Sequence, residues 1–85
     1  MKIHDWEYNN DYNVWYKVVC TTQNGQRSAS YYLTASIYSC QKGYQSFIDK
    51  SSYWGDELRQ CEHHSLELAK EWCDTVLQEY ANKGI

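Results

Sequence analysis

The residues of this 85-residue chain that could hold a metal ion or act as nucleophiles are its cysteines and histidines. Cys61, His63 and Cys73 could in principle assemble one Cys/His metal site. The chain has no Cys-x-x-Cys pair, however, which is the usual spacing of a structural zinc site. We therefore expect reduced thiols that pack as small hydrophobic side chains, and neither a metal nor a cofactor. The four thiols are those of Cys20, Cys40, Cys61 and Cys73.

Nucleophilic catalysis would require a serine or cysteine held at an activating turn beside a histidine. No Gly-x-Ser-x-Gly elbow occurs in the sequence. The adjacent His63 and His64 would point to opposite faces of an extended segment, so one site could not use both. The paired acids Asp56 and Glu57 have no neighbours that suggest a shielded pocket. The sequence therefore predicts no catalytic residues and a protein that is not an enzyme.

Ser65 to Asn82 is the longest segment with a single clear period, and it predicts a helix. Its apolar residues recur at three- and four-residue steps, which places them on one stripe. That stripe is Leu66, Ala69, Trp72, Cys73, Val76, Leu77 and Tyr80, and the opposite, solvated face is Glu67, Lys70, Glu71, Asp74, Gln78 and Glu79. Ser65 can cap the first turn, and Lys83 and Gly84 are typical stop signals.

The segments ahead of this helix alternate as strands do. The expected strands span residues 2–8, 12–22, 27–40 and 44–49. Asn24-Gly25 predicts a tight hairpin turn between the second and third, and Gln41-Lys42-Gly43 predicts another turn. Residues 57–64 fit either a last edge strand or the start of the helix. We favour the strand, because Ser65 makes a good helix cap.

These elements predict one α+β domain over residues 1–85, in which an antiparallel sheet of three to five strands (within residues 2–62) packs one face against a C-terminal helix (residues 65–82). Met1–Trp6 is followed by polar residues rather than an apolar run, so no signal peptide is expected. No segment approaches the length of a membrane span. We therefore expect a cytoplasmic protein with no membrane partner.

Aromatic residues are the unusual feature of the composition, with nine tyrosines and four tryptophans against one phenylalanine. Tyr and Trp suit surfaces that are wet when free and dry when bound. One helix covers only one face of a sheet, so we expect Trp15, Tyr32 and Tyr38 on the other face, and Tyr53-Trp54 in an exposed loop. These five residues are the expected protein interface, although several could instead complete a two-sided core.

Nucleic-acid binding through the same aromatics is the alternative, with bases stacked on sheet tyrosines. The net charge of −3 disfavours it, and Lys17 and Arg27 are almost the only bases available on that face. The element order is similar to that of double-stranded-RNA-binding domains, whose final helix opens on a basic run. Here the matching residues 63–67 read His-His-Ser-Leu-Glu, with Lys70 the only strong base nearby.

The chain also resembles small phage- and prophage-encoded single-domain proteins. It shares their early tryptophan, their tyrosine-rich strands and a helix that opens Ser-Leu-x-x-Ala-Lys, here Ser65, Leu66, Ala69 and Lys70. Many proteins of this kind inhibit host defence, anti-CRISPR proteins among them, and act by occupying a surface. The resemblance implies a non-enzymatic inhibitor that binds a protein partner. Self-association through the same aromatic face, as a two-fold dimer, is the remaining alternative.

Overall fold

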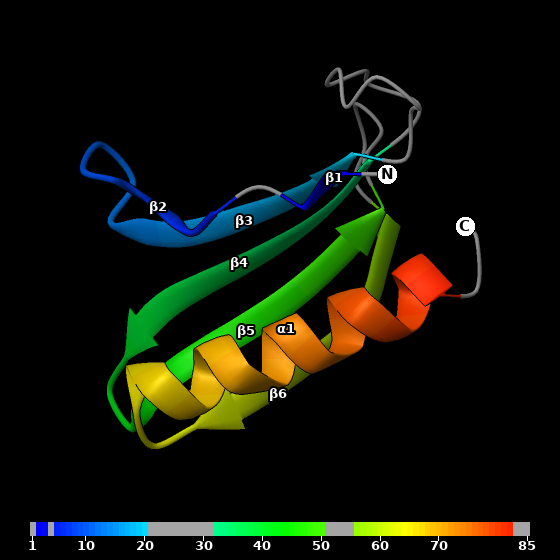
Figure 1. Cartoon of the computed structure of the whole chain (residues 1–85). Helices are drawn as coiled ribbons and strands as arrows, with labels where there is room; N and C mark the ends of the chain where they lie inside the picture. The colour runs from blue at the N-terminus through cyan, green and yellow to red at the C-terminus, as the bar shows by residue number, and fades with distance from the viewer. Residues whose placement is uncertain (1, 4, 21–31, 51–55, 83–85) are drawn as a thin grey trace.

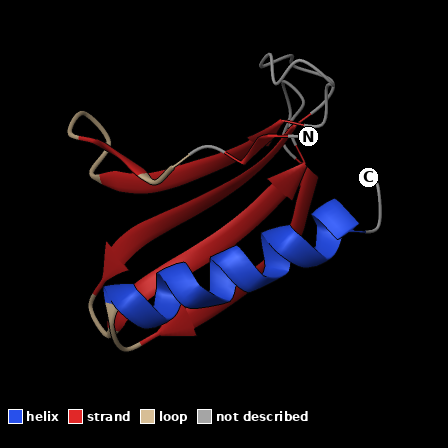
Figure 2. Ribbon diagram, viewed as in Figure 1, coloured by secondary structure: helices blue, strands red, loops and turns tan. Residues whose placement is uncertain are grey.

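The computed structural model describes residues 2–3, 5–20, 32–50 and 56–82, with the backbone alone at 2, 3, 20, 32, 56 and 57. These residues form one antiparallel sheet with the C-terminal helix α1 (Leu66–Asn82) lying across one face (Figures 1 and 2). The strands are β1 (Lys2–Ile3), β2 (Glu7–Asn9), β3 (Val14–Cys20), β4 (Tyr32–Cys40), β5 (Gly43–Lys50) and β6 (Asp56–His63). The expected α+β architecture is confirmed.

The strands are arranged in the order β1-β3-β4-β5-β6, and β2 also pairs with β3. Ile3 of β1 pairs with Val19, near one end of β3, and Asn9 of β2 pairs with Val14 at the other end. The single strand expected over residues 2–8 is therefore wrong, because Asp5 and Trp6 separate two short strands. The strand expected near residues 57–64 is confirmed as β6, which pairs with β5 along its length.

Two turns differ from their expected bounds. Cys40 pairs directly with Gly43, so the β4–β5 turn consists of Gln41 and Lys42, and Gly43 already belongs to β5. Tyr12, expected within a strand, lies in the turn before β3, which Asn13 completes with a left-handed φ of 51°. The predicted turn at Asn24-Gly25 lies outside the described residues.

Helix α1 begins and packs as the sequence predicts. The backbone N–H of Leu68 donates a hydrogen bond of 3.2 Å to Oγ of Ser65, which is the expected cap. The stripe residues Ala69, Cys73, Val76 and Leu77 are buried, and Leu66, Trp72 and Tyr80 pack against the same cluster. The sheet contributes Val19, Leu33, Ala35, Ile37 and Ile48 to this core. The helix lies over β4, β5 and β6, so a single apolar layer joins helix and sheet.

Candidate functional site

The register of the sheet fixes which side chains lie under the helix. Directly opposed residues of antiparallel strands point to the same face. Trp15 opposes Ile37, and Val19 opposes Leu33, so these β3 residues share the face that α1 covers. We call this the helix face. The expectation that Trp15 lies beside Tyr38 on the opposite face is therefore wrong.

Trp15 instead forms the margin of the core. Its ring is half-buried, lies 4.9 Å from the ring of Tyr8, and has the ammonium nitrogen of Lys70 4.0 Å from its centroid. Lys70, expected on the solvated side of the helix, is thus half-buried against an aromatic ring. The sequence misplaced Trp15 because β3 carries valines on both of its faces, and only the pairing with β4 decides which face is covered.

The other face of the sheet, which we call the outer face, has no described helix or strand lying over it (Figure 1). Its side chains alternate with those of the helix face. Its described side chains are Glu7, Asn9, Val14, Tyr16, Val18, Thr34, Ser36, Tyr38, Cys40, Gln45, Phe47, Asp49, Gln60 and Glu62. Among the described elements, α1 lies only on the opposite face, while Val14 and Val18 of the outer face are themselves buried.

An aromatic group occupies the middle of the outer face. Tyr38 is 41% exposed, and its ring meets the ring of Phe47 edge-on, with 6.0 Å between the ring centroids. Tyr16, two residues from Val14 on β3, adds a half-buried ring to the same face. Val14 pairs with Tyr38 across the two strands and is only 7% exposed, so the side chains around Tyr38 pack closely against one another. We call Tyr16, Tyr38 and Phe47 the aromatic patch.

The aromatic patch only partly matches the expected interface residues. Tyr38 lies where the sequence placed it, and the backbone of Tyr32 pairs with Cys20 at the end of the same two strands. Tyr53 and Trp54 lie outside the described residues. Tyr16 and Phe47 were not among the expected site residues. The alternation along β5 nevertheless placed the side chain of Phe47 on the other face of the strand from that of Ile48, which is buried.

Three thiols have described side chains, those of Cys40, Cys61 and Cys73. Cys73 is fully buried in the core, and this burial raises the pKa of its thiol to about 11. The group therefore stays protonated at neutral pH and is a poor nucleophile. Cys40, Cys61 and Cys73 form no disulfide. Among the described residues, no group of three or more His, Cys, Asp and Glu side chains is placed to hold a metal ion, so Cys61, His63 and Cys73 do not form the site considered above.

His63 is a second titratable group that packs beside the helix. Its ring lies 5.5 Å from the ring of Trp72, and its Nε2 is buried without a hydrogen-bond partner in the described part of the chain. Burial lowers the pKa of His63 from its ordinary value of 6.5, because the charged ring would lose hydration. The neutral imidazole is thus the form that fits beneath α1.

This packing predicts a pH-dependent stability. The unfolded chain takes up a proton on His63 near pH 6.5, while the folded chain resists it, so the free energy of unfolding should fall as pH drops from 7.5 to 5.5. Denaturant titrations across that range should give a shallower decline for His63→Asn than for the wild type. His64→Asn, at the exposed neighbouring position, should keep the wild-type slope. Equal slopes for the two variants would contradict the placement of His63.

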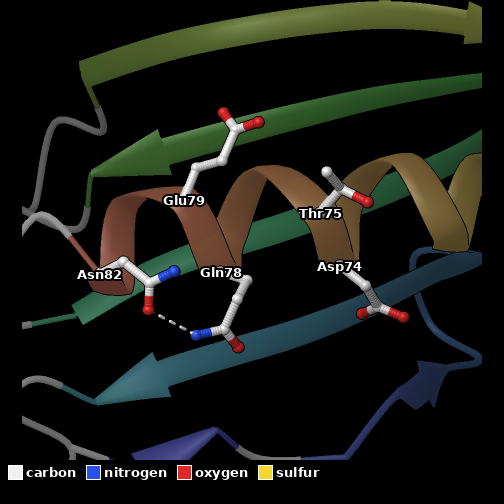
Figure 3. A pocket seen from close by; sticks show the side chains of 5 residues that line it. All are labelled: Asp74, Thr75, Gln78, Glu79 and Asn82. Atoms are coloured by element: carbon white, nitrogen blue, oxygen red, sulfur yellow. Dashed lines mark hydrogen bonds between the residues drawn. The ribbon is translucent and has the colours of Figure 1, made fainter.

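A shallow hollow of about 400 Å³ lies on the exposed side of α1 (Figure 3). It is lined by Asp74, Thr75, Gln78, Glu79 and Asn82. Gln78 donates a hydrogen bond of 2.9 Å to Asn82, whereas Asp74 and Glu79 extend away from each other. The hollow thus brings no acid and base together, and we assign it no role.

Among the described residues, no helix has both the length and the apolar character needed to cross a membrane. No family model, curated protein or solved structure matches the chain. The outer face with its aromatic patch is therefore the candidate site on the strength of its own geometry.

Proposed function

We propose that this protein is a non-enzymatic binding module whose outer face docks onto a protein partner. The observation that carries the proposal is the aromatic patch, in which Tyr38 and Phe47 share a sheet face that no described helix or strand covers. Tyr side chains with an apolar ring and a hydroxyl are enriched at the centres of protein interfaces. Docking would bury the exposed part of the Tyr38 ring, and it requires no reacting group on either side.

The position of Lys17 favours a protein over a nucleic acid. Nucleic-acid binding on the aromatic patch would need bases on the same face to follow the phosphates. Lys17 opposes Ala35 on the helix face, and its ammonium lies 2.7 Å from a carboxylate oxygen of Asp74 in α1. It is therefore engaged beneath the helix, on the side away from Tyr38. Arg27, the other base considered, lies outside the described residues.

A phage-type inhibitor that acts by surface occlusion is the specific form of this function that we propose. Such an inhibitor needs one rigid face that excludes a competing ligand from its target. The aromatic patch lies on three hydrogen-bonded central strands, β3, β4 and β5, which hold it in place before binding. The layout of the sequence remains the reason for considering a phage protein.

Affinity capture with matched tyrosine variants tests the proposed function. The bait is the full chain, and the lysate is that of the cells that make it, treated with nuclease. Tyr38→Ser should weaken binding of the captured protein by about 30-fold, the equivalent of about 2 kcal/mol for an interface hot spot. Tyr12→Ser is the control, since Tyr12 is 73% exposed in the turn before β3. Equal capture by both variants, or loss of every partner after nuclease, would overturn the proposal.

A further inference from the structure

Three aromatic rings gather at the margin of the helix face. Tyr8 of β2 and Trp15 of β3 are direct cross-strand partners, and their ring centroids lie 4.9 Å apart. Trp6, in the segment between β1 and β2, packs against the same core cluster as Trp15. Helix α1 lies over β4, β5 and β6, so the three rings lie to the side of the helix (Figure 1). We call Trp6, Tyr8 and Trp15 the ring cluster.

The ring cluster already holds a cation. The ammonium nitrogen of Lys70, which extends from α1, lies 4.0 Å from the ring centroid of Trp15 and 5.9 Å from that of Trp6. Both distances fall within the range of about 6 Å over which the face of an aromatic ring attracts a positive charge. Two ring faces thus converge on one ammonium group, which is the arrangement that binds cationic ligands in aromatic cages.

A second lysine near the ring cluster has its charge balanced by a carboxylate. The ammonium nitrogen of Lys17 lies 5.6 Å from the ring centroid of Trp6, and the same atom lies 2.7 Å from a carboxylate oxygen of Asp74. A cation that took the place of the Lys70 ammonium would therefore leave the charge at this place unchanged. The ring cluster can accept such an exchange without placing an additional charge beside Lys17.

The ring cluster is held in position and is partly open to solvent. The hydroxyl of Tyr8 donates a hydrogen bond of 3.2 Å to Oδ1 of Asn13, which fixes the position of the Tyr8 ring. Tyr8 is 42% exposed, and Trp6, Trp15 and Lys70 are half-buried. A ligand can therefore reach the rings without opening the core, provided that the Lys70 side chain swings away. Rings that are positioned before binding lower the cost of taking up a ligand.

We propose that the ring cluster is a binding site for a quaternary ammonium group, such as the head of choline or the side chain of a trimethylated lysine. Methyl groups spread the charge and weaken its hydration, so this cation loses less on leaving water for an aromatic cage. An unmethylated lysine ammonium is strongly hydrated, and Lys70 competes well with it because Lys70 belongs to the same chain. Lys70 therefore holds the site against unmethylated amines and yields it to methylated ones.

This site is separate from the aromatic patch that carries the proposed function. Trp15 and its partner Tyr8 lie on the helix face, whereas Tyr38 and Phe47 lie on the outer face. The quaternary ammonium site does not depend on the partner that docks on the outer face. Failure of one proposal therefore leaves the other standing.

Titration of the ¹⁵N-labelled full chain with choline chloride tests the site. The indole N–H signals of Trp6 and Trp15 should shift, while the indole signal of Trp72, which packs beside His63 of β6, should stay in place. Sodium chloride at the same concentrations should produce no such shifts. The neutral analogue of choline, with carbon in place of nitrogen, should also produce none, because it lacks the charge. Equal shifts with the neutral analogue, or no shifts with choline, would overturn the proposal.

Two peptides distinguish a protein side chain from a free small molecule as the source of the ligand. The capped peptides are identical except for one lysine, which is trimethylated in the first and unmodified in the second. Binding of the trimethylated peptide more tightly than choline would assign the site to a modified protein, and the reverse order would assign it to a free small molecule. The unmodified peptide should not shift the two indole signals. Equal shifts with both peptides would overturn the proposal.

Matched variants test the contributions of the resident lysine and of the outer ring. Lys70→Ala vacates the ring cluster and should tighten choline binding about fivefold, the effect of one exposed cation–π contact. Lys42→Ala, which removes an exposed lysine from the β4–β5 turn, should leave the affinity unchanged. Tyr8→Leu should weaken choline binding about threefold, whereas Tyr12→Leu, in the turn before β3, should have no effect. Equal affinities within either pair of variants would overturn the proposal.

Discussion

Replacing Gly43 with alanine is expected to lower the free energy of unfolding by about 3 kcal/mol or more. Gly43 begins β5 with a φ of 139°, a backbone conformation that side chains rarely adopt. A methyl group there would also meet the backbone carbonyl oxygen of His63 on the neighbouring strand β6. The strain and the collision act together, so β5 and β6 would have to separate at the end where α1 begins.

Chemical denaturation followed by circular dichroism measures this effect. Lys42→Ala is the control, since Lys42 is an exposed turn residue immediately before Gly43 and its substitution should change stability by less than about 0.5 kcal/mol. A Gly43→Ala protein with wild-type stability would contradict the close approach of β5 and β6.

Leu77→Ala is expected to cost about 2–5 kcal/mol, because the side chain is 1% exposed in the layer between α1 and the sheet. Leu68→Ala removes the same atoms from the same helix at a position that is 49% exposed, and should cost less than about 1 kcal/mol. Alanine is the better helix former, which further reduces the second effect. The same denaturation measurement applied to both variants compares them directly. Similar losses for the two leucines would mean that the buried side of α1 is misassigned.

The helix was predictable in detail because one period and one capping residue determine it. The stripe from Leu66 to Tyr80 packs on the sheet as its spacing indicates, and Ser65 caps the first turn. The faces of β4 were equally clear, because Leu33, Ala35 and Ile37 alternate with polar or aromatic residues. In both elements the apolar residues are confined to one side, so the pattern has a single interpretation.

The faces of β3 could not be predicted in this way. Val14 and Val18 alternate with Trp15 and Val19, so either set could have faced the helix. The pairing of Trp15 with Ile37 determines which of the two sets faces the helix. This pairing joins residues far apart in the chain, so it cannot be predicted from the local sequence pattern of β3. The same limit applies to the candidate site. Tyr16 joins Tyr38 and Phe47 only after the three strands β3, β4 and β5 are aligned.

The central claim is that the outer face is the binding surface. Hydroxyl-radical footprinting of the captured complex is its most direct test. Side-chain oxidation is measured by mass spectrometry for the free chain and for the chain bound to its partner. We predict that Tyr16, Tyr38 and Phe47 become protected on binding, whereas Tyr12 in the turn and Leu68 on α1 keep their reactivity. Protection of Leu68, with Tyr38 and Phe47 as reactive as in the free chain, would place the partner on the helix side and contradict the account.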